Sequence, residues 1–389
     1  MDRFPSYLNS RDQIRSEQRV LLGVGQVLRV APLLLLLTAC AFPGAVRPTV
    51  KIGLVAPFEG RYRYVGYDVI YAVQLALFEA NEDAGGAGYG VELVAYDDGA
   101  NPDVAVEQAR KLDVDPAVVA AIGHFRETTT AAAIGTYADA GIPLVTPTVL
   151  GPGVPADQDI VYRLGPAAEL LADALLERAS HLAPNREFAL IGQSGPLEAA
   201  LQRAARERAG KELPVVSASV PGWETEVLDR GPSVLLFDLE PVRAGEVVSV
   251  LRERGWSGHI LGGPALAPSD FVAVAGQAAA GALFVTPWPF PSDVPDGEPF
   301  VAAYRRISNG VEPGPLALPA YEATRTLLEA LEQADADGEL TRKRVNAALS
   351  DGGRWSILGR PTNDESGEWS DADLYWYRIG PEGVPELQG

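Results

Sequence analysis

The sequence has few residues of the kinds that build metal centres and disulfide frameworks. Among its 389 residues there is one cysteine, Cys40, and there are three histidines, His124, His181 and His259. A single cysteine cannot close an internal disulfide bond, and the histidines stand too far apart to form the closely spaced pairs that bind zinc. We therefore expect no internal disulfide and no zinc site, and we predict no cofactor.

Long apolar runs and excess positive charge are also missing. A membrane-spanning helix needs about 20 consecutive apolar residues, and the apolar run from Val30 to Ala39 has only about half that length. The formal net charge is −20 and the isoelectric point is about 4.6. Binding to a phosphate backbone needs a basic face, so the composition argues strongly against nucleic acid as a partner. The length is too great for one ordinary core and predicts two domains.

The first forty residues have the layout of an export signal. Arg19 and Arg29 precede the short apolar run, and small residues lead into Cys40. The ending L-T-A-C resembles the signal of bacterial lipoproteins, in which the cysteine receives a diacylglycerol on its sulfur and becomes the new N-terminus. Acyl chains anchor a protein by burying CH₂ groups, at about 0.8 kcal/mol each. A buried N-terminal helix with an incidental cysteine is the alternative.

The lipoprotein resemblance implies where the protein works. Residues 1–39 would be a signal peptide, Cys40 would carry the lipid, and residues 40–49 would form a tether. The membrane would then be a partner through the lipid anchor. The resemblance implies an exported protein on the outer face of the cytoplasmic membrane, in the cell envelope or periplasm.

From Val50 the chain alternates short β-rich runs with longer amphipathic stretches. The run 50–58 is almost continuously apolar, which is typical of a strand buried on both faces. The next stretch, 66–83, has apolar residues three and four apart, as in a helix with one buried face. Asn101 and Pro102 predict the N-cap and first position of a further helix. The alternation predicts an α/β fold, a parallel sheet with helices on both faces, and it restarts in the second half of the chain.

Six segments, in order, resemble the type I periplasmic binding proteins, in particular the receptors of branched-chain amino acid (Leu/Ile/Val) ABC transporters. They are IGLVAPFEGRYRYVG (52–66), LALFEANEDAGG (75–86), YDDGANPDVAVEQARKL (96–112), AAIGHFRETTTAAAIGTYADAGIPLVTPT (120–148), GALFVTPWPF (281–290) and NDESGEWSDADLYWYRI (363–379). The resemblance implies two doubly wound Rossmann-like lobes joined by crossover strands. It places lobe 1 at 50–163 plus 287–353, and lobe 2 at 164–286 plus 354–389.

The resemblance also implies a mechanism. Two lobes close around a small solute, and the closed form docks onto an ABC transporter permease. Closure is driven by contacts that the solute makes with both lobes only when they are shut. The crossovers are expected near Arg163–Gly165, near Thr286–Trp288 and near Arg354–Leu358.

The expected solute site departs from the family pattern. Amino-acid binders usually carry a serine in the loop after the third strand, where this chain has Glu127 between Arg126 and Thr128. The next loop usually reads Ser-Pro-Ser-Ala-Thr, and here Leu150 replaces the final threonine. A binder that loses paired polar groups loses several kcal/mol for that solute. Amino-acid specificity is therefore not transferred, and the exact solute stays open.

Side chains at the strand ends are the candidates for contact with the solute. Aromatic walls could come from Tyr62, Tyr64, Phe125 and Trp288, although packing in the core is the alternative for each. Glu127 and Asp238 could meet a cationic or hydroxylated group and Arg126 an anionic one, unless Arg126 and Glu127 form a solvated pair. The remaining candidates are Thr128, which could instead cap a helix, Thr148 and Val149. His124 is expected to pack near the lobe's end, and Asp97-Asp98 to form a turn and not a metal pair.

The sequence carries no recognisable enzyme motif. The segment GQSGP around Ser194 lacks the final glycine of a nucleophile elbow, because Pro196 stands there. No glycine-rich nucleotide loop follows a strand. We predict a binding protein and not an enzyme. A receptor that reports a ligand to another membrane protein, and a degenerate homologue without a small-molecule ligand, remain the alternatives.

Overall fold

The computed structural model describes residues 48–83, 89–148, 160–184, 188–295, 297–336, 339–351 and 372–388. The chain from Thr49 onwards forms one compact unit. The predictions for the signal peptide, Cys40, Val149 and the third crossover lie outside the described residues. In the described part of the chain, no helix combines the length and the apolar character needed to cross a membrane.

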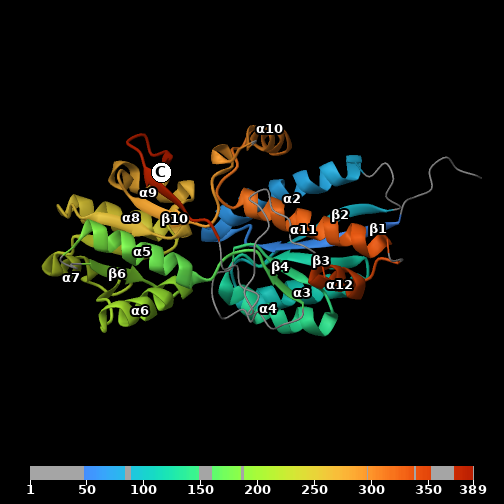
Figure 1. Cartoon of the computed structure of the whole chain (residues 1–389), viewed down its shortest axis with the longest axis horizontal. Helices are drawn as coiled ribbons and strands as arrows, with labels where there is room; N and C mark the ends of the chain where they lie inside the picture. The colour runs from blue at the N-terminus through green and yellow to red at the C-terminus, as the bar shows by residue number, and fades with distance from the viewer. Residues whose placement is uncertain are drawn as a thin grey trace, which may run out of the picture. The chain divides into compact units, whose positions relative to one another are not determined.

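The first lobe is built on a five-stranded parallel sheet with strand order β2-β1-β3-β4-β5 (Figure 1). Strand β1, which lies between β2 and β3, has buried residues at six of eight positions, as the apolar run predicted. The strands are β1 (Thr49–Ala56), β2 (Gly90–Asp97), β3 (Val118–Gly123), β4 (Leu144–Thr146) and β5 (Val161–Arg163).

Helices cover both faces of this first sheet. On one face α2 (Arg63–Asp83) and α11 (Ala317–Ala336) pack together over side chains such as Ile52 and Leu54. On the other face α3 (Pro102–Val114) and α4 (Glu127–Ala140) pack over side chains such as Val55 and Leu144. The late helices α10 (Gly297–Ile307) and α12 (Arg342–Asp351) complete the lobe.

The start of α3 confirms the predicted cap. The Asn101 side chain accepts hydrogen bonds from the backbone N–H groups of Asp103 and Val104, and Pro102 occupies the first helical position. The cap satisfies N–H groups that have no partner within the helix.

The second lobe is built on a seven-stranded sheet with order β12-β11-β10-β9-β8-β6-β7. Helices α8 (Pro241–Glu253) and α9 (Ser269–Ala275) pack on one face, and α5 (Ala168–Leu182) and α6 (Pro196–Ala209) on the other. A further helix, α7 (Trp223–Arg230), contacts β7. The strands are β6 (Phe188–Gly192), β7 (Val215–Ser217), β8 (Val234–Asp238), β9 (His259–Gly262), β10 (Leu283–Thr286), β11 (Tyr375–Ile379) and β12 (Pro385–Gln388).

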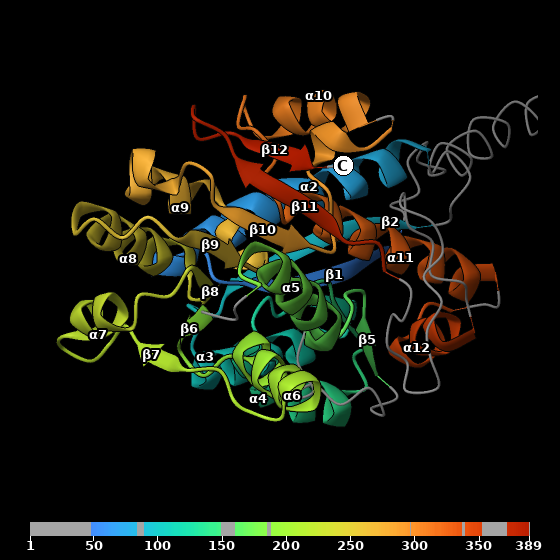
Figure 2. The same cartoon turned by 60° about the vertical axis from the view of Figure 1, so that its left-hand side comes forward.

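The second sheet is not wholly parallel, because its last two strands form an antiparallel hairpin. β11 runs antiparallel to β10, and β12 antiparallel to β11. Figure 2 shows these three strands side by side at one edge. After β10 the chain returns to the first lobe and forms α10, α11 and α12 there. It then comes back to the second sheet as the hairpin β11–β12. The residue boundaries expected for the two lobes stay a prediction.

Candidate functional site

The loops that follow the parallel strands bring charged and aromatic side chains of the first lobe together. In a parallel sheet the carboxyl ends of the strands meet at one edge, where ligands commonly bind. After β3 the chain turns into α4, with Arg126 as the N-cap residue. The Arg126 guanidinium carbon lies 4.0 Å from the centre of the Tyr62 ring. Such a cation–π contact holds the guanidinium group in place while leaving its N–H groups able to bind an anion.

Asp238, the last residue of β8, belongs to the second lobe but lies within electrostatic range of this pair. Burial raises the pKa of Asp238, and the charges of Glu198 and Glu127 raise it further. The pKa is lowered by a 2.9 Å hydrogen bond from the Glu198 backbone N–H and by the positive charge of Arg126. The structure therefore brings three predicted site residues, Arg126, Glu127 and Asp238, near one another across the two lobes.

The loop before α6 is shaped around the Asp238 carboxylate. A Cβ atom at Gly195 would lie 2.5 Å from Asp238 Oδ2, so only glycine leaves room for the carboxylate at this point. The Glu198 backbone N–H that binds Asp238 belongs to the first turn of the same helix. These two features fix the position of the Asp238 side chain.

The hydroxyl of Tyr64 is affected by charged residues of both lobes. It is the second residue of α2, and burial raises the pKa of its hydroxyl. The charge of Arg126 lowers this pKa, whereas the charges of Glu240 and Asp270 raise it. Tyr64 therefore lies close to charges of both lobes.

The other predicted site residues are dispersed. Phe125 and Trp288 are buried side chains of the hydrophobic core, with exposed fractions of 7% and 5%. Thr148 is partly buried and its hydroxyl donates to the Phe125 carbonyl at 3.4 Å. Thr128 is exposed and lies inside α4, so the alternative that it caps the helix is wrong.

His124 lies in a buried network, in agreement with the packing role expected for it. Its Nδ1 is 2.7 Å from Asp98 Oδ2, and its Nε2 is 3.2 Å from the Tyr137 hydroxyl. All three residues have no exposed surface. Asp97 and Asp98 accept hydrogen bonds from the backbone N–H groups of the following turn, as predicted. Within the described residues, no group of His, Cys, Asp and Glu is arranged to hold a metal ion.

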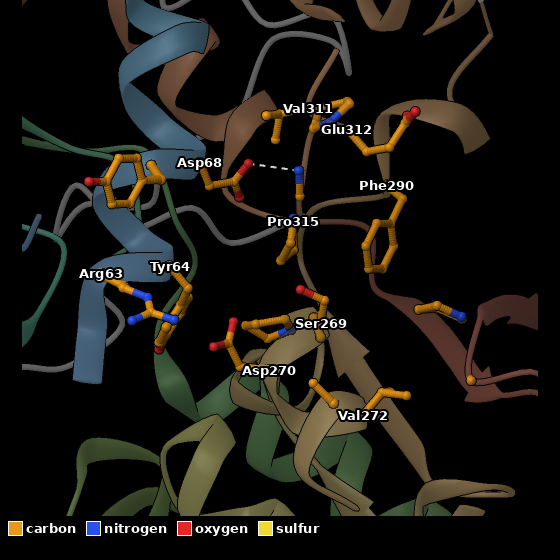
Figure 3. A pocket seen from close by; sticks show the side chains of 18 of the residues that line it. Arg63, Tyr64, Asp68, Ser269, Asp270, Val272, Phe290, Val311, Glu312 and Pro315 are labelled. Atoms are coloured by element: carbon orange, nitrogen blue, oxygen red, sulfur yellow. Dashed lines mark hydrogen bonds between the residues drawn. The ribbon is translucent and has the colours of Figure 1, made fainter. Parts of the chain in front are cut away.

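A cavity of about 640 Å³ opens beside Tyr64 (Figure 3). Its walls come from both lobes: the start of α2, the start of α9, the segment after β10, the loop before α11 and the β11–β12 turn. Most of the lining is apolar or aromatic. The lining residues are Arg63, Tyr64, Tyr67, Asp68, Ala267, Pro268, Ser269, Asp270, Val272, Ala273, Phe290, Tyr304, Val311, Glu312, Pro313, Gly314, Pro315, Gly383 and Pro385.

Two of the charged groups around the cavity are already engaged within the protein. The Asp68 carboxylate accepts hydrogen bonds from the backbone N–H groups of Gly314 and Leu316, both at 2.7 Å. Burial raises the pKa of Asp68 to about 7, although these N–H groups act to lower it. Glu312 makes a two-point contact with Arg305, at 2.7 and 2.8 Å. These contacts fix the loop 311–316 that forms one wall.

Five polar side chains of the lining have no such contacts. Within the described part of the chain, no partner forms a hydrogen bond or an ion pair with the side chains of Arg63, Tyr64, Tyr67, Ser269 and Asp270. Arg63, Ser269 and Asp270 carry no local sequence signal, because they line one cavity only when distant segments come together.

Comparison with known proteins gives the family. The sequence profile described as periplasmic binding protein matches residues 49–372. The chain belongs to the type I periplasmic binding proteins. This periplasmic binding protein is 24% identical over 348 residues to the leucine-, isoleucine-, valine-, threonine- and alanine-binding protein of Pseudomonas aeruginosa, which covers 85% of this chain and 89% of that protein. It is also 24% identical over 341 residues to the Leu/Ile/Val-binding protein of Escherichia coli, covering 83% and 89%.

Solved structures share the fold of this periplasmic binding protein. The branched-chain amino acid transporter substrate binding protein of Streptococcus pneumoniae, in complex with isoleucine, has a TM-score of 0.76 at 20% identity and covers 87% of this chain and 99% of that one. A solute binding protein of an ABC transporter from R. palustris, in complex with benzoate, has a TM-score of 0.74 at 17% identity, covering 88% and 96%. The family binds solutes and is not a family of enzymes, and it implies a place outside the cytoplasm.

Proposed function

We propose that this protein is a lipid-anchored receptor that captures a small polar solute between its two lobes and delivers it to an ABC transporter permease. One observation carries the proposal. Asp238 of the second lobe lies within electrostatic range of Arg126 and Glu127 of the first, so charged groups of both lobes act on one another. A solute that contacts both sets gains most of its contacts when the lobes are close together.

This arrangement supports capture by closure. A ligand shifts a conformational equilibrium only by the difference in its affinity for the two states. Groups divided between two lobes supply such a difference, because a solute reaches both in the closed state alone. The closed state would then be the form that the permease recognises.

The proposed cell location rests on the sequence around Cys40. A diacylglycerol on its sulfur, with residues 40–49 as the tether, would hold the receptor at the outer face of the cytoplasmic membrane. Metabolic labelling with a radioactive fatty acid tests this: the full chain should be labelled, and the Cys40→Ala variant should not.

A binding screen tests the capture of a solute. Residues 41–389 contain the whole compact unit Thr49–Gly389 and can be purified without the signal segment. We expect at least one solute among amino acids, short peptides, amides and aromatic acids to raise the melting temperature. A solute at a hundred times its Kd stabilises by about 2.7 kcal/mol.

The same solute should also compact the protein in small-angle scattering. Absence of any melting shift over the whole library would contradict solute capture. A shift without compaction would contradict capture by closure.

A further inference from the structure

We propose that a pocket of the second lobe, away from the space between the lobes, is a second binding site that takes a small monocarboxylate with a short aliphatic body. This α5–α6 pocket lies between the C-terminal halves of α5 and α6 and the segment that leads into β7. The proposed function does not use it. The residues of its lining that carry the argument are Leu176, Phe188, Ala205, Arg208, Lys211 and Leu213.

The position of the α5–α6 pocket separates it from the site of solute capture. Phe188 is the first residue of β6, whereas Gly192, the last residue of β6, pairs with Asp238 at the opposite edge of the sheet. A strand rises about 3.3 Å per residue, so the two ends of β6 are about 13 Å apart. Figure 2 shows α5 and α6 side by side in this part of the lobe. A ligand in the pocket is therefore held by the second lobe alone.

The inner wall of the α5–α6 pocket is apolar. Leu176, Ala205 and Leu213 are buried members of the core between the second sheet and the two helices, and Phe188 packs against this core. The pocket opens at the end of that core and has a volume of about 220 Å³. This volume equals about seven water molecules at about 30 Å³ each, which suits an aliphatic body of about six carbon atoms. Such a body gains free energy when it leaves water.

The outer wall is fixed by hydrogen bonds within the protein. The Gln202 side chain accepts a hydrogen bond from the Leu213 backbone N–H at 2.9 Å and donates one to the Leu213 carbonyl at 3.1 Å. Gly210 ends α6 with a φ of 68°, a conformation that favours glycine, and turns the chain into this wall. A wall that is already ordered lowers the entropic cost of binding a ligand.

Positive charge gathers at the mouth of the α5–α6 pocket. Arg208 binds Asp173 Oδ1 through Nε and Nη2, at 3.1 and 2.5 Å, and its Nη1 forms no hydrogen bond with the described part of the chain. Lys211 forms neither a hydrogen bond nor an ion pair within that part. Glu212, which also lines the pocket, is paired with Arg206 at 3.2 Å. The charge left for a ligand is therefore positive, and a carboxylate complements it.

The end of α6 limits the ligand to a single negative charge. Ala209, the last residue of this helix, lines the pocket. A helix C-terminus carries about half a negative elementary charge and repels an anion near its last turn. This helix end offsets part of the positive charge of Arg208 and Lys211. What remains suits one carboxylate better than a doubly charged phosphate ester.

Calorimetric titration of residues 41–389 with three matched probes tests the inference. Hexanoate has both the charge and the body, hexan-1-ol lacks the charge, and butyrate has a shorter body. Hexanoate should bind about fivefold more tightly than hexan-1-ol, because an exposed charge pair contributes modestly. It should bind up to about fifteenfold more tightly than butyrate, since each buried methylene contributes about fourfold. In about 1 M salt the difference between hexanoate and hexan-1-ol should shrink.

Two variants separate the charge from the body. Lys211→Gln should weaken hexanoate about three- to fivefold and change the affinity for hexan-1-ol less than about twofold. Ala209→Phe fills the pocket with a ring and should weaken both probes about tenfold or more. Ala209 is exposed at the end of a helix, so this variant should keep the melting temperature of the unaltered protein. Lys343→Gln and Ala302→Phe, at exposed positions outside the lining, are controls that should leave all affinities unchanged.

Three outcomes would overturn the inference. Equal affinity for hexanoate and hexan-1-ol, unchanged by Lys211→Gln, would mean that the charge at the mouth has no role. An unchanged affinity for hexanoate in Ala209→Phe would mean that the probe binds elsewhere, for example in the cavity between the lobes. Absence of binding for all three probes would mean that the pocket takes no ligand of this class. Each of these results leaves the proposed function standing, because the wider solute screen tests it separately.

Discussion

Two groups of polar side chains differ in their hydrogen-bonding partners: one lies inside the first lobe and the other lines the cavity. His124, Asp98 and Tyr137 are fully buried and bonded to one another. At the cavity, Arg63 is exposed and Asp270 is half-buried, and neither has such a partner among the described residues. Buried polar groups need internal partners, because water cannot reach them. The comparison separates polar groups that stabilise the lobe from polar groups that are available to a solute.

The largest effect should come from breaking the buried network. Asp98→Ala removes the acceptor of the 2.7 Å contact with His124 Nδ1 and of the Ala100 N–H bond. The imidazole would stay buried without that partner, so we expect the free energy of unfolding to fall by about 3 kcal/mol. Unfolding in urea measures this.

The matched control for that variant is Asp270→Ala in the cavity. It removes a carboxylate that makes no contact of this kind, so the free energy of unfolding should change by less than about 0.5 kcal/mol. Equal losses in the two variants would abolish the distinction between stabilising and available groups.

Asp68 is the intermediate case, since it lines the cavity but is bonded to the loop 311–316. Its pKa is raised by burial from 3.8 to about 7. Between about pH 4 and 7 the folded protein keeps this proton while the unfolded chain has lost it. Stability from this residue is therefore fully present below pH 4 and is lost as the pH rises towards 7, with a slope of at most about 1.4 kcal/mol per pH unit.

Urea unfolding between pH 4 and 8 tests the role of Asp68. The Asp68→Asn variant should lose this part of the pH dependence, whereas Asp270→Asn should keep it. An identical slope in the Asp68→Asn variant and the unaltered protein would show that another group titrates.

The smallest measurable loss of stability should come from the edge of the buried network. Tyr137→Phe removes only the hydroxyl that lies 3.2 Å from His124 Nε2 and keeps the edge-on ring contact. We expect a loss of about 1 kcal/mol in the free energy of unfolding. A loss as large as that of Asp98→Ala would mean that the Tyr137 hydroxyl contributes as much to the buried network as the Asp98 carboxylate does.

Much of the fold could be predicted from the sequence because its signals are local. The apolar run of β1, the spacing in α2 and the cap at Asn101 each lie within a few residues. The antiparallel β12 had no such signal: its residues, Pro385–Gln388, include no β-branched or aromatic side chain, and they form a strand because they pair with β11. Helix α9 has only seven residues, too few to show a helical repeat.

The site could be predicted only in part for the same reason. Arg126 comes after β3 and Asp238 is the last residue of β8, and the sequence predicts both strands. Their position at the carboxyl ends of the two sheets could therefore be predicted. The cavity depends on segments more than two hundred residues apart, such as Arg63 and Asp270, which no motif connects. Whether Phe125 and Trp288 touch the solute stays a prediction, since both lie in the core.

The position of β11 and β12 at the edge of the second sheet has a consequence for folding during synthesis. β11 and β12 extend the second sheet from β10, yet they are synthesised after all the other described elements. Helix α11, which packs on α2 in the first lobe, also comes late. Neither lobe can complete its core until these late elements have been synthesised. Such a nascent chain stays unfolded until these elements have been made. An unfolded chain can pass through a narrow export channel and fold on the far side.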